Sequence, residues 1–390
     1  MSYRSLPVAL LGALCLATAA PAQGVRFDPV ARAVQDGIRK GLYPGAVLVV
    51  GRRDTILFAR GFGNLTWNKR SARPSAWTTL WDLASVTKVV ATTGALAVLV
   101  DRGSVDLDAP VSRYLPRFTG GGRDSVTVRM LLNHTSGLRA YAPLHSLAST
   151  REGAIDLVYA EPLTRLPGTR AVYSDLNAIL LGFLVEAVAG VPLSNAARDL
   201  VFDPMKMGFT TFGPLLPEQA VVAPSRQVAG RPAPGQVDDA NARRLGSVAG
   251  HAGLFSTGLD LAKYAQAWLR RGDLPGGSWV SESTIAAFLN RSPASGSRLL
   301  GWDSPERETG GVSAFGSLSS AASFGHTGWT GTLLWIDPEL DLFLVFLSNR
   351  SLAPRHRSSL TAMRTVRAHV SDIVTRAALA ECTVARRAAC

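Results

Sequence analysis

The placement of strand-forming segments constrains the fold most, because these segments lie near the two ends of the chain and are sparse between them. Near the start, residues 46–50 and 55–59 are apolar, partly β-branched runs separated by a short polar turn. Near the end, residues 331–336 and 342–348 flank a second turn that contains Pro338. A strand pair at each end predicts that the two ends together build one antiparallel sheet.

Helical patterns occupy most of the remaining chain. Residues 28–40 have the periodicity of an amphipathic helix, and residues 358–379 predict a final helix. Residues 85–101 predict a long apolar helix that is buried, because Lys88 and Asp101 are its only charged residues. Three further helices are expected at 174–189, 193–202 and 259–271.

Composition supports a single folded domain. The chain has 390 residues, of which 47% are hydrophobic and 18% are charged, and no low-complexity block divides it. We therefore expect the α/β class in its α+β form, with an antiparallel sheet flanked by helices plus a mainly helical lobe, in one domain over residues 23–390. The sheet lobe is expected at about 25–80 and 291–390, and the helical lobe at about 81–290.

The first 22 residues have the pattern of a signal peptide. Arg4 supplies a positive charge, residues 6–18 are an apolar stretch, and Ala20-Pro21-Ala22 offers small residues for cleavage. The apolar stretch is shorter than the roughly 20 residues that a spanning helix needs. We expect cleavage near Ala22, export to the periplasm or the medium, and no stable membrane span.

The net charge of +12 comes from scattered arginines without a clustered basic stripe. This pattern argues against a nucleic-acid partner and indicates a basic surface that tolerates anionic envelope polymers. The sequence lacks metal-ligand spacings, a P-loop and a dinucleotide fingerprint, so we expect no metal and no cofactor. Cys382 and Cys390 form either a small disulfide-closed loop or two free thiols.

Ser85-Val86-Thr87-Lys88, at the start of the long apolar helix, is the first candidate for chemistry. Residues three apart share one face of a helix, so the Lys88 amine can approach the Ser85 oxygen. Apolar surroundings disfavour a charged lysine, so we expect Lys88 to accept a proton and activate Ser85. Taken alone, the spacing favours a structural explanation, with Ser85 as a helix N-cap and Lys88 as a side chain that reaches the surface.

Two later elements change the interpretation. Tyr173-Ser174-Asp175 opens another apolar helix, and His326-Thr327-Gly328 precedes the final strand pair. Their order after Ser85-x-x-Lys88 resembles the motif set of serine beta-lactamases and penicillin-binding enzymes. Segments 131–138 and 250–257 resemble further blocks of that superfamily. The similarity is to the branch of class C beta-lactamases, D-alanyl-D-alanine carboxypeptidases, D-aminopeptidases and lactamase-like esterases.

The resemblance implies a beta-lactamase/transpeptidase-like fold and a serine hydrolase domain. Ser85 would be the acylated nucleophile, Lys88 its partner base, and Tyr173 the group that carries a proton to the leaving group. Whether Lys88 or Tyr173 takes the first proton stays open. The backbone amides of Ser85 and Trp329 would form the oxyanion hole. The implied substrate-binding residues are Asp175, His326, Thr327 and Gly328.

Two of these residues depart from the usual pattern of the superfamily. Asp175 stands where asparagine is usual, and a carboxylate only accepts hydrogen bonds, so Asp175 should bind a different group or pair with a cation. His326 stands where beta-lactamases usually have lysine, and its charge should vary near neutrality. A protonated His326 is a candidate, with Lys88, for stabilising a Tyr173 phenolate. Gly328 fits a position where substrate passes close to the backbone.

The leading expectation is an exported hydrolase that forms an acyl-enzyme on Ser85 and acts on D-amino-acid peptides or related amides of the cell wall. A lactamase-like carboxylesterase is the first alternative, favoured by the departures at Asp175 and His326. A beta-lactamase is the second, although Asp175 argues against efficient hydrolysis of beta-lactams. A non-catalytic envelope-binding protein is the third, and the intact Ser85, Lys88 and Tyr173 argue against it.

Overall fold

The structure is a computed structural model that describes residues 27–218, 220–305, 313–357 and 359–385. The predicted signal peptide at 1–22 lies outside these residues. The question of a bond between Cys382 and Cys390 also lies outside them, because neither side chain is described.

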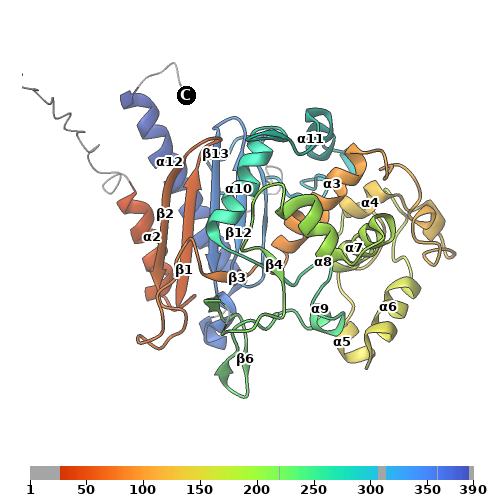
Figure 1. The fold of residues 1–390 in the computed structure, drawn as a ribbon, viewed down its shortest axis with the longest axis horizontal. Helices are drawn as coiled ribbons and strands as arrows, with labels where there is room; N and C mark the ends of the chain where they lie inside the picture. Colours follow the sequence, from red (N-terminus) through yellow and green to blue (C-terminus); the bar gives the residue numbers. More distant parts are fainter. Residues whose placement is uncertain (1–26, 219, 306–312, 358, 386–390) are drawn as a thin grey trace, which may run out of the picture.

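The two ends of the chain build one antiparallel sheet, as predicted. Its strand order is β11-β12-β13-β1-β2, and every neighbouring pair is antiparallel. The pairing of β1 with β13 joins the N-terminal hairpin to the C-terminal strands (Figure 1). The strands are β1 (Gly45–Gly51), β2 (Ile56–Gly63), β11 (Phe324–Thr327), β12 (Leu333–Asp337) and β13 (Leu342–Ser348).

Both faces of this sheet are covered, which explains why its central strands are apolar throughout. Alternate residues of β1 point to opposite faces. Leu48 packs with helices α2 (Asp28–Arg39) and α12 (Leu360–Ala385), whereas Val47 and Val49 belong to the core on the other face. Figure 1 shows α2 and α12 on one side of the sheet and α10 on the other.

Helix α10 (Gly258–Leu269) differs from its expected place. Residues 81–290 were expected in the helical lobe, but α10 packs against β1, β12 and β13 of the main sheet. A Cβ on Gly258 would lie 2.9 Å or less from the Val47 and Val49 side chains, so the helix starts in close contact with the sheet. Helices α2 and α12 cover only one face of the main sheet. The apolar side of α10 covers the opposite face, on which Val47 and Val49 lie.

The helical side of the molecule is built around the segment that follows Ser85. The expected helix over 85–101 forms as a π-helical stretch, η1 (Lys88–Thr93), followed by α3 (Gly94–Asp101). Neighbouring helices are α7 (Asp175–Ala189) and α8 (Leu193–Ala197), the latter continued by the π-helical η4 (Arg198–Phe202). The other helices are α4 (Val128–Leu132), α5 (Leu144–Leu147), α6 (Arg151–Ala160), α9 (Ala240–Arg244) and α11 (Glu282–Leu289).

Short 3-10 turns complete the helical segments. They are η2 (Val111–Arg113), η3 (Arg123–Ser125), η5 (Pro293–Ser295), η6 (Arg350–Leu352) and η7 (Arg355–Arg357).

A small sheet, which the sequence did not predict, positions the start of the buried helix. Its order is β4-β8-β3-β5, and β3 (Leu80–Asp82) ends three residues before Ser85. Its other strands are β4 (Thr211–Phe212), β5 (Val222–Ala223) and β8 (Leu254–Ser256). Two hairpins complete the strands: β6 (Gln227–Val228) with β7 (Arg231–Pro232), and β9 (Asp273–Leu274) with β10 (Gly277–Ser278).

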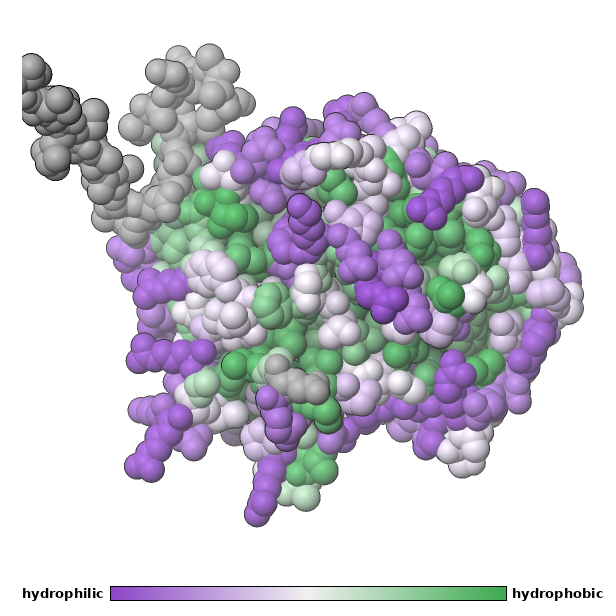
Figure 2. Space-filling model, viewed as in Figure 1, coloured by the Kyte–Doolittle hydropathy of each residue, from purple (hydrophilic) through white to green (hydrophobic). Residues whose placement is uncertain are grey.

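The surface in Figure 2 mixes hydrophilic and hydrophobic side chains over the whole face in view. Within the described residues, no single helix combines the length and the apolar composition needed to cross a membrane. The α7 helix and residues 193–202 reach that length and composition only as a pair bent by 80°.

Gly182 in α7 and Gly250 in the loop before β8 pack directly against each other. A Cβ on Gly250 would lie 2.0 Å from the Ala178 carbonyl oxygen and 2.9 Å from the Gly182 nitrogen, both in α7. On its other side, the Gly250 carbonyl accepts a 2.8 Å hydrogen bond from the Thr92 hydroxyl. Gly250 therefore fixes the separation between α7 and the helix that follows Ser85.

Gly250→Ala is expected to lower the free energy of unfolding by about 1 to 3 kcal/mol, because the added methyl group forces α7 to move. Urea unfolding followed by circular dichroism measures the effect. Gly208→Ala is the control, because a Cβ on Gly208 meets no described atom within 4 Å. Equal stability of the two variants would show that the packing of α7 on this loop is loose.

Candidate active site

Ser85 lies on a strained turn that a buried carboxylate holds in place. The residue before it, Ala84, has a φ of 46°, a region that residues with a Cβ rarely adopt. Asp82 accepts a 2.9 Å hydrogen bond from the Ala84 amide and a 2.7 Å bond from the Asp238 amide. The Thr330 hydroxyl donates to the Asp82 carbonyl at 2.7 Å. These contacts hold Ser85 at the junction of β3 with the C-terminal sheet.

Lys88 is the centre of the site. Its Nζ donates to the Ser85 hydroxyl oxygen at 2.9 Å and to the His251 carbonyl at 3.2 Å. It also forms an ion pair with Asp175, with 2.8 Å between Nζ and Oδ1. The predicted approach of Lys88 to Ser85 is therefore present, and Asp175 takes the second of its two expected roles, pairing with a cation.

The charge state of Lys88 differs from the sequence-based expectation. Burial alone lowers the pKa of Lys88, but the opposite charge of Asp175 and the contacts with Tyr173 outweigh it, so the net pKa is raised. Lys88 is thus an ammonium group at neutral pH that donates to Ser85. This direction is opposite to the one that the apolar helix alone predicts, because the helix sequence does not reveal a carboxylate that arrives from α7, and the role of Lys88 as the base of Ser85 stays a prediction.

Tyr173 lies beside this amine, just before α7. Its ring centroid is 5.0 Å from the Lys88 Nζ and 4.8 Å from the Arg298 Cζ. The His134 ring lies 4.9 Å away and the His326 ring 5.7 Å away. Two cations and two imidazoles therefore surround the tyrosine.

His326 is neutral in this environment. Burial, followed by the positive charges of Lys88 and Arg298, lowers the pKa of His326 well below its ordinary value of 6.5. Its Nδ1 lies 2.8 Å from the Thr327 carbonyl, which can only accept, so we assign the proton to Nδ1. The buried Nε2 is then a free acceptor within the described structure. The lowered pKa argues against a protonated His326 as a stabiliser of a Tyr173 phenolate and leaves Lys88 as the other candidate.

The predicted oxyanion-hole residues line one cleft of about 280 Å³ together with Tyr173 and His326. Within the described part of the chain, the backbone amides of Ser85 and Trp329 donate to no other group. Two such amides can receive the negative oxygen of a tetrahedral intermediate.

Gly328 lines the same cleft, and the structure adds a packing requirement to its expected role beside the substrate. A Cβ there would lie 2.4 Å from the Leu83 carbonyl oxygen and 2.1 Å from the Thr332 hydroxyl. Gly328 is therefore required for the packing of the end of β11 on the turn before Ser85.

Two arginines at this cleft, Arg298 and Arg367, were not predicted as site residues. Arg298 lines the cleft from the loop that follows α11. Arg367 reaches it from α12, and its Nη2 donates to the Gly328 carbonyl at 2.6 Å. Burial and then the nearby Arg350 lower the pKa of Arg367 to about 9, so it stays charged at neutral pH. Neither arginine lies in a motif, so only the fold could reveal them.

Two buried histidines, His134 and His251, anchor loops around the site. His134 accepts a 3.2 Å hydrogen bond from the Ser174 amide, which fixes the start of α7 behind Tyr173. The His251 Nε2 lies 3.0 Å from the Asp239 Oδ1, and its carbonyl faces Lys88. Among the residues that the structure describes, no group of three or more His, Cys, Asp or Glu side chains is placed to hold a metal ion.

A serine hydroxyl and a tyrosine that share one buried amine are equipped for nucleophilic acyl transfer. The surrounding sheet and helices have the arrangement of serine beta-lactamases and transpeptidases. The chain belongs to the beta-lactamase family, within the superfamily of serine beta-lactamases and penicillin-binding proteins. The family model described as Beta-lactamase matches residues 30–367.

Relatives and solved structures agree with this placement. A protein of Salmonella schwarzengrund named "Putative D-alanyl-D-alanine carboxypeptidase" is 32% identical over 358 residues, which cover 82% of each chain. The structure of EstCE1, "a hydrolase with promiscuous acyltransferase activity", matches 90% of this chain and 99% of its own at a TM-score of 0.73 and 23% identity. A family VIII carboxylesterase matches 91% and 98% at a TM-score of 0.67 and 22% identity. At these identities, the two structures establish the fold.

Asp175→Asn is expected to lower the pKa of Lys88, because it removes the opposing charge and leaves the burial that disfavours the ammonium group. Titration of ¹⁵N-labelled lysine side chains by NMR measures this shift, and the chain has only five lysines to resolve. Lys88→Met assigns the signal, and Asp273→Asn, at an exposed aspartate, is the matched control. An unchanged Lys88 titration in Asp175→Asn would contradict the ion pair.

Proposed function

We propose that the protein is a serine hydrolase that forms an acyl-enzyme on Ser85 and cleaves D-amino-acid peptides or related amides of the cell wall. The observation that carries the proposal is the 2.9 Å contact between the Ser85 hydroxyl oxygen and the Lys88 Nζ, in a cleft that also contains Tyr173. The name of the Salmonella relative supports the choice of D-alanyl peptides.

In the proposed reaction, Tyr173 acts in its phenolate form: the Ser85 oxygen bonds to the substrate carbonyl carbon, the carbonyl electron pair moves to the carbonyl oxygen, and the Ser85 proton passes to the phenolate oxygen. Lys88 and Arg298, both close to the Tyr173 ring, stabilise negative charge on that oxygen. The amides of Ser85 and Trp329 hold the tetrahedral oxyanion. The bond to the leaving group then breaks as Tyr173 returns the proton to it, and water hydrolyses the acyl-enzyme.

The charge of Lys88 decides its role in this scheme. Because its pKa is raised by Asp175 and Tyr173 against the effect of burial, Lys88 acts as a fixed positive charge. We therefore assign the first proton transfer to Tyr173, and Lys88 orients Ser85 as a hydrogen-bond donor.

A carboxylesterase is the second candidate, and one observation favours it. Asp175 faces Lys88 and cannot donate to an amide carbonyl of a substrate, as an asparagine at this position could. An ester is easier to cleave than an amide, because an alcohol leaving group needs less protonation than an amine. An ester substrate can therefore react without the hydrogen bond that an asparagine would donate. The same observation argues against efficient hydrolysis of beta-lactams.

The experiment compares wild type and Ser85→Ala on a D-alanyl-D-alanine peptide, a short p-nitrophenyl ester and a fluorescent penicillin, with intact mass recorded over time. We expect Ser85-dependent release of D-alanine and a slowly lost penicillin adduct. Tyr173→Phe should lower kcat by about 10² to 10⁴, the usual contribution of a general acid or base.

Each outcome assigns the function. Turnover of the ester alone would establish the esterase, and rapid release of hydrolysed penicillin would establish a beta-lactamase. Activity or labelling that survives in Ser85→Ala would disprove the assignment of the nucleophile. Stoichiometric binding of wall fragments without any turnover would favour a non-catalytic binding protein.

We also propose that the protein is exported after removal of residues 1–22. The charged start, the apolar stretch and the small residues before Gln23 support this proposal. Expression of the full chain in a Gram-negative host should give a mature protein whose N-terminal residue is Gln23, and N-terminal sequencing of the periplasmic fraction checks it. An intact Met1 in the cytoplasmic fraction would contradict export.

A further inference from the structure

A cavity of about 1020 Å³ adjoins the catalytic cleft. One wall is formed by residues 169–173, which lead into α7, and the other by residues 291–298, which follow α11. A 3.2 Å hydrogen bond from the Ala171 amide to the Ala294 carbonyl ties the two walls together. Ligand pockets are commonly about 300 to 1,000 Å³, so this cavity can hold a group much larger than one alanine.

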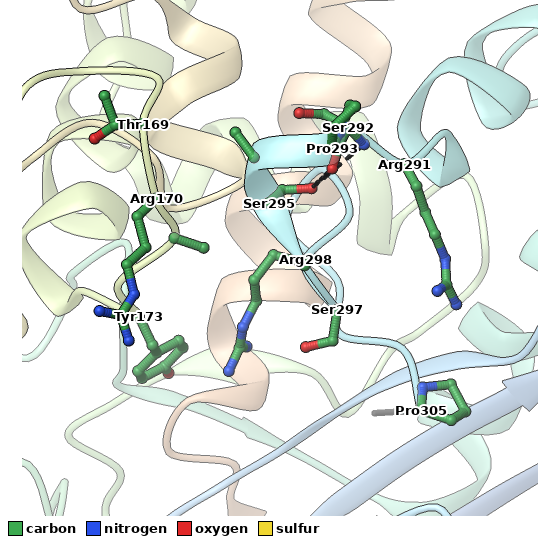
Figure 3. Close-up of a pocket in the computed structure, with 13 residues that line it drawn as sticks. Thr169, Arg170, Tyr173, Arg291, Ser292, Pro293, Ser295, Ser297, Arg298 and Pro305 are labelled. Atoms are coloured by element: carbon green, nitrogen blue, oxygen red, sulfur yellow. Dashed lines mark hydrogen bonds between the residues drawn. The ribbon is translucent and has the colours of Figure 1, made fainter. Parts of the chain in front are cut away.

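Positive charge lines this cavity. Arg170, Arg291 and Arg298 contribute to its walls, and no acidic residue is among its described lining residues. Figure 3 shows Arg170 and Arg298 extending on the side where Tyr173 lies, whereas Arg291 extends along the other side of the 292–298 segment toward Pro305. The cavity therefore presents positive charge at two places.

These arginines have capacity for a ligand. Arg170 is exposed and has no ion pair with any described residue. The only described contact of the Arg291 guanidinium is a 3.2 Å hydrogen bond to the Ala321 carbonyl. Arg298 already forms an ion pair with Asp303, with 3.5 Å between its Nη1 and the Asp303 Oδ2, so it adds positive charge to the wall but is partly engaged. A guanidinium binds a carboxylate through two parallel hydrogen bonds, so Arg170 and Arg291 can each bind one.

The position of Tyr173 indicates which part of a substrate enters this cavity. Tyr173 and Arg298 line both the cavity and the cleft that contains Ser85. In the proposed reaction Tyr173 returns a proton to the leaving group, so the leaving group must lie against Tyr173. The cavity then receives the remainder of the leaving group.

We propose that this cavity is a leaving-group subsite for a chain that carries at least two carboxylates, one near Arg170 and Arg298 and one near Arg291. The substrate class is thus an acyl compound whose departing part is an acidic peptide, larger than a single D-alanine. This inference rests on the proposed acyl-enzyme function. It predicts that the enzyme selects its substrates by the charge and size of the leaving group.

The test uses thioesters that share one acyl group, N-acetyl-D-alanyl, and differ only in the charge of the departing thiol. The thiols are mercaptoacetyl-D-glutamate, with two carboxylates, and mercaptoacetyl-D-glutamine amide, which is neutral and almost the same size. The released thiol is measured with a thiol reagent. The readout is the ratio of kcat/KM for the dianionic thioester to that for the neutral one.

We expect a wild-type ratio of at least about ten, which corresponds to about 1.4 kcal/mol, and a ratio several-fold lower in the double variant Arg170→Gln, Arg291→Gln, which keeps only Arg298. Salt should reduce the wild-type ratio only partly, because screening is weaker in a cavity than at an open surface. Arg32→Gln removes one charge from the exposed side of α2, far along the chain from the cavity walls, and should keep the wild-type ratio.

A ratio near one in wild type, with Ser85-dependent turnover of the neutral thioester, would overturn the subsite and leave the proposed function intact. An unchanged high ratio in the double variant would also overturn it, as would an equal decrease in Arg32→Gln. If Ser85→Ala and wild type hydrolyse the thioesters equally slowly, the proposed function itself fails, and this inference fails with it.

Discussion

The ion pair between Lys88 and Asp175 is the interaction on which the rest of the site depends. It joins the helix after Ser85 to the first turn of α7, and it keeps a buried amine charged where burial alone would neutralise it. A buried pair is costly to desolvate, and removing one partner leaves an uncompensated charge. The same pair sets the position of Lys88 beside the Ser85 oxygen and excludes Asp175 from donating to a substrate.

The geometry around this pair comes from contacts that are unrelated to catalysis. Gly250 lets α7 approach the helix that follows Ser85, and Gly328 lets the end of β11 approach the Leu83 carbonyl. The hydroxyls of Thr330 and Thr332 donate to the carbonyls of Asp82 and Leu83, which fixes the turn before Ser85. Two small residues and two hydroxyls therefore set the distance between the nucleophile and the strand edge that carries the second free amide.

Electrostatics divides the site into two parts with different tasks. At the reacting atoms, Lys88 is charged and His326 is neutral, so a fixed ammonium group replaces the variable imidazolium that histidine could supply. Around the cleft, arginines from separate segments supply positive charge, among them Arg298 and Arg367. Lys88 and His326 act on the bond that is cleaved. The arginines around the cleft act on charged groups elsewhere in the substrate.

The sequence by itself determined the antiparallel pairing of the two chain ends, the helices near residues 28–40, 174–189, 259–271 and 358–379, and the spacing of Ser85 and Lys88, because these follow from side-chain periodicity along a continuous segment. It did not predict the shorter helices α4, α5, α6, α9 and α11. It could not determine the small sheet before Ser85, whose strands are two or three residues long, or the packing of α10 on the main sheet. Only the tertiary structure decided that Lys88 is charged, that His326 is neutral and that scattered arginines meet at one cleft. The physical reason is that the charge state of a side chain depends on its burial and on neighbours from distant segments. The spacing of residues along the sequence reveals neither its burial nor these neighbours.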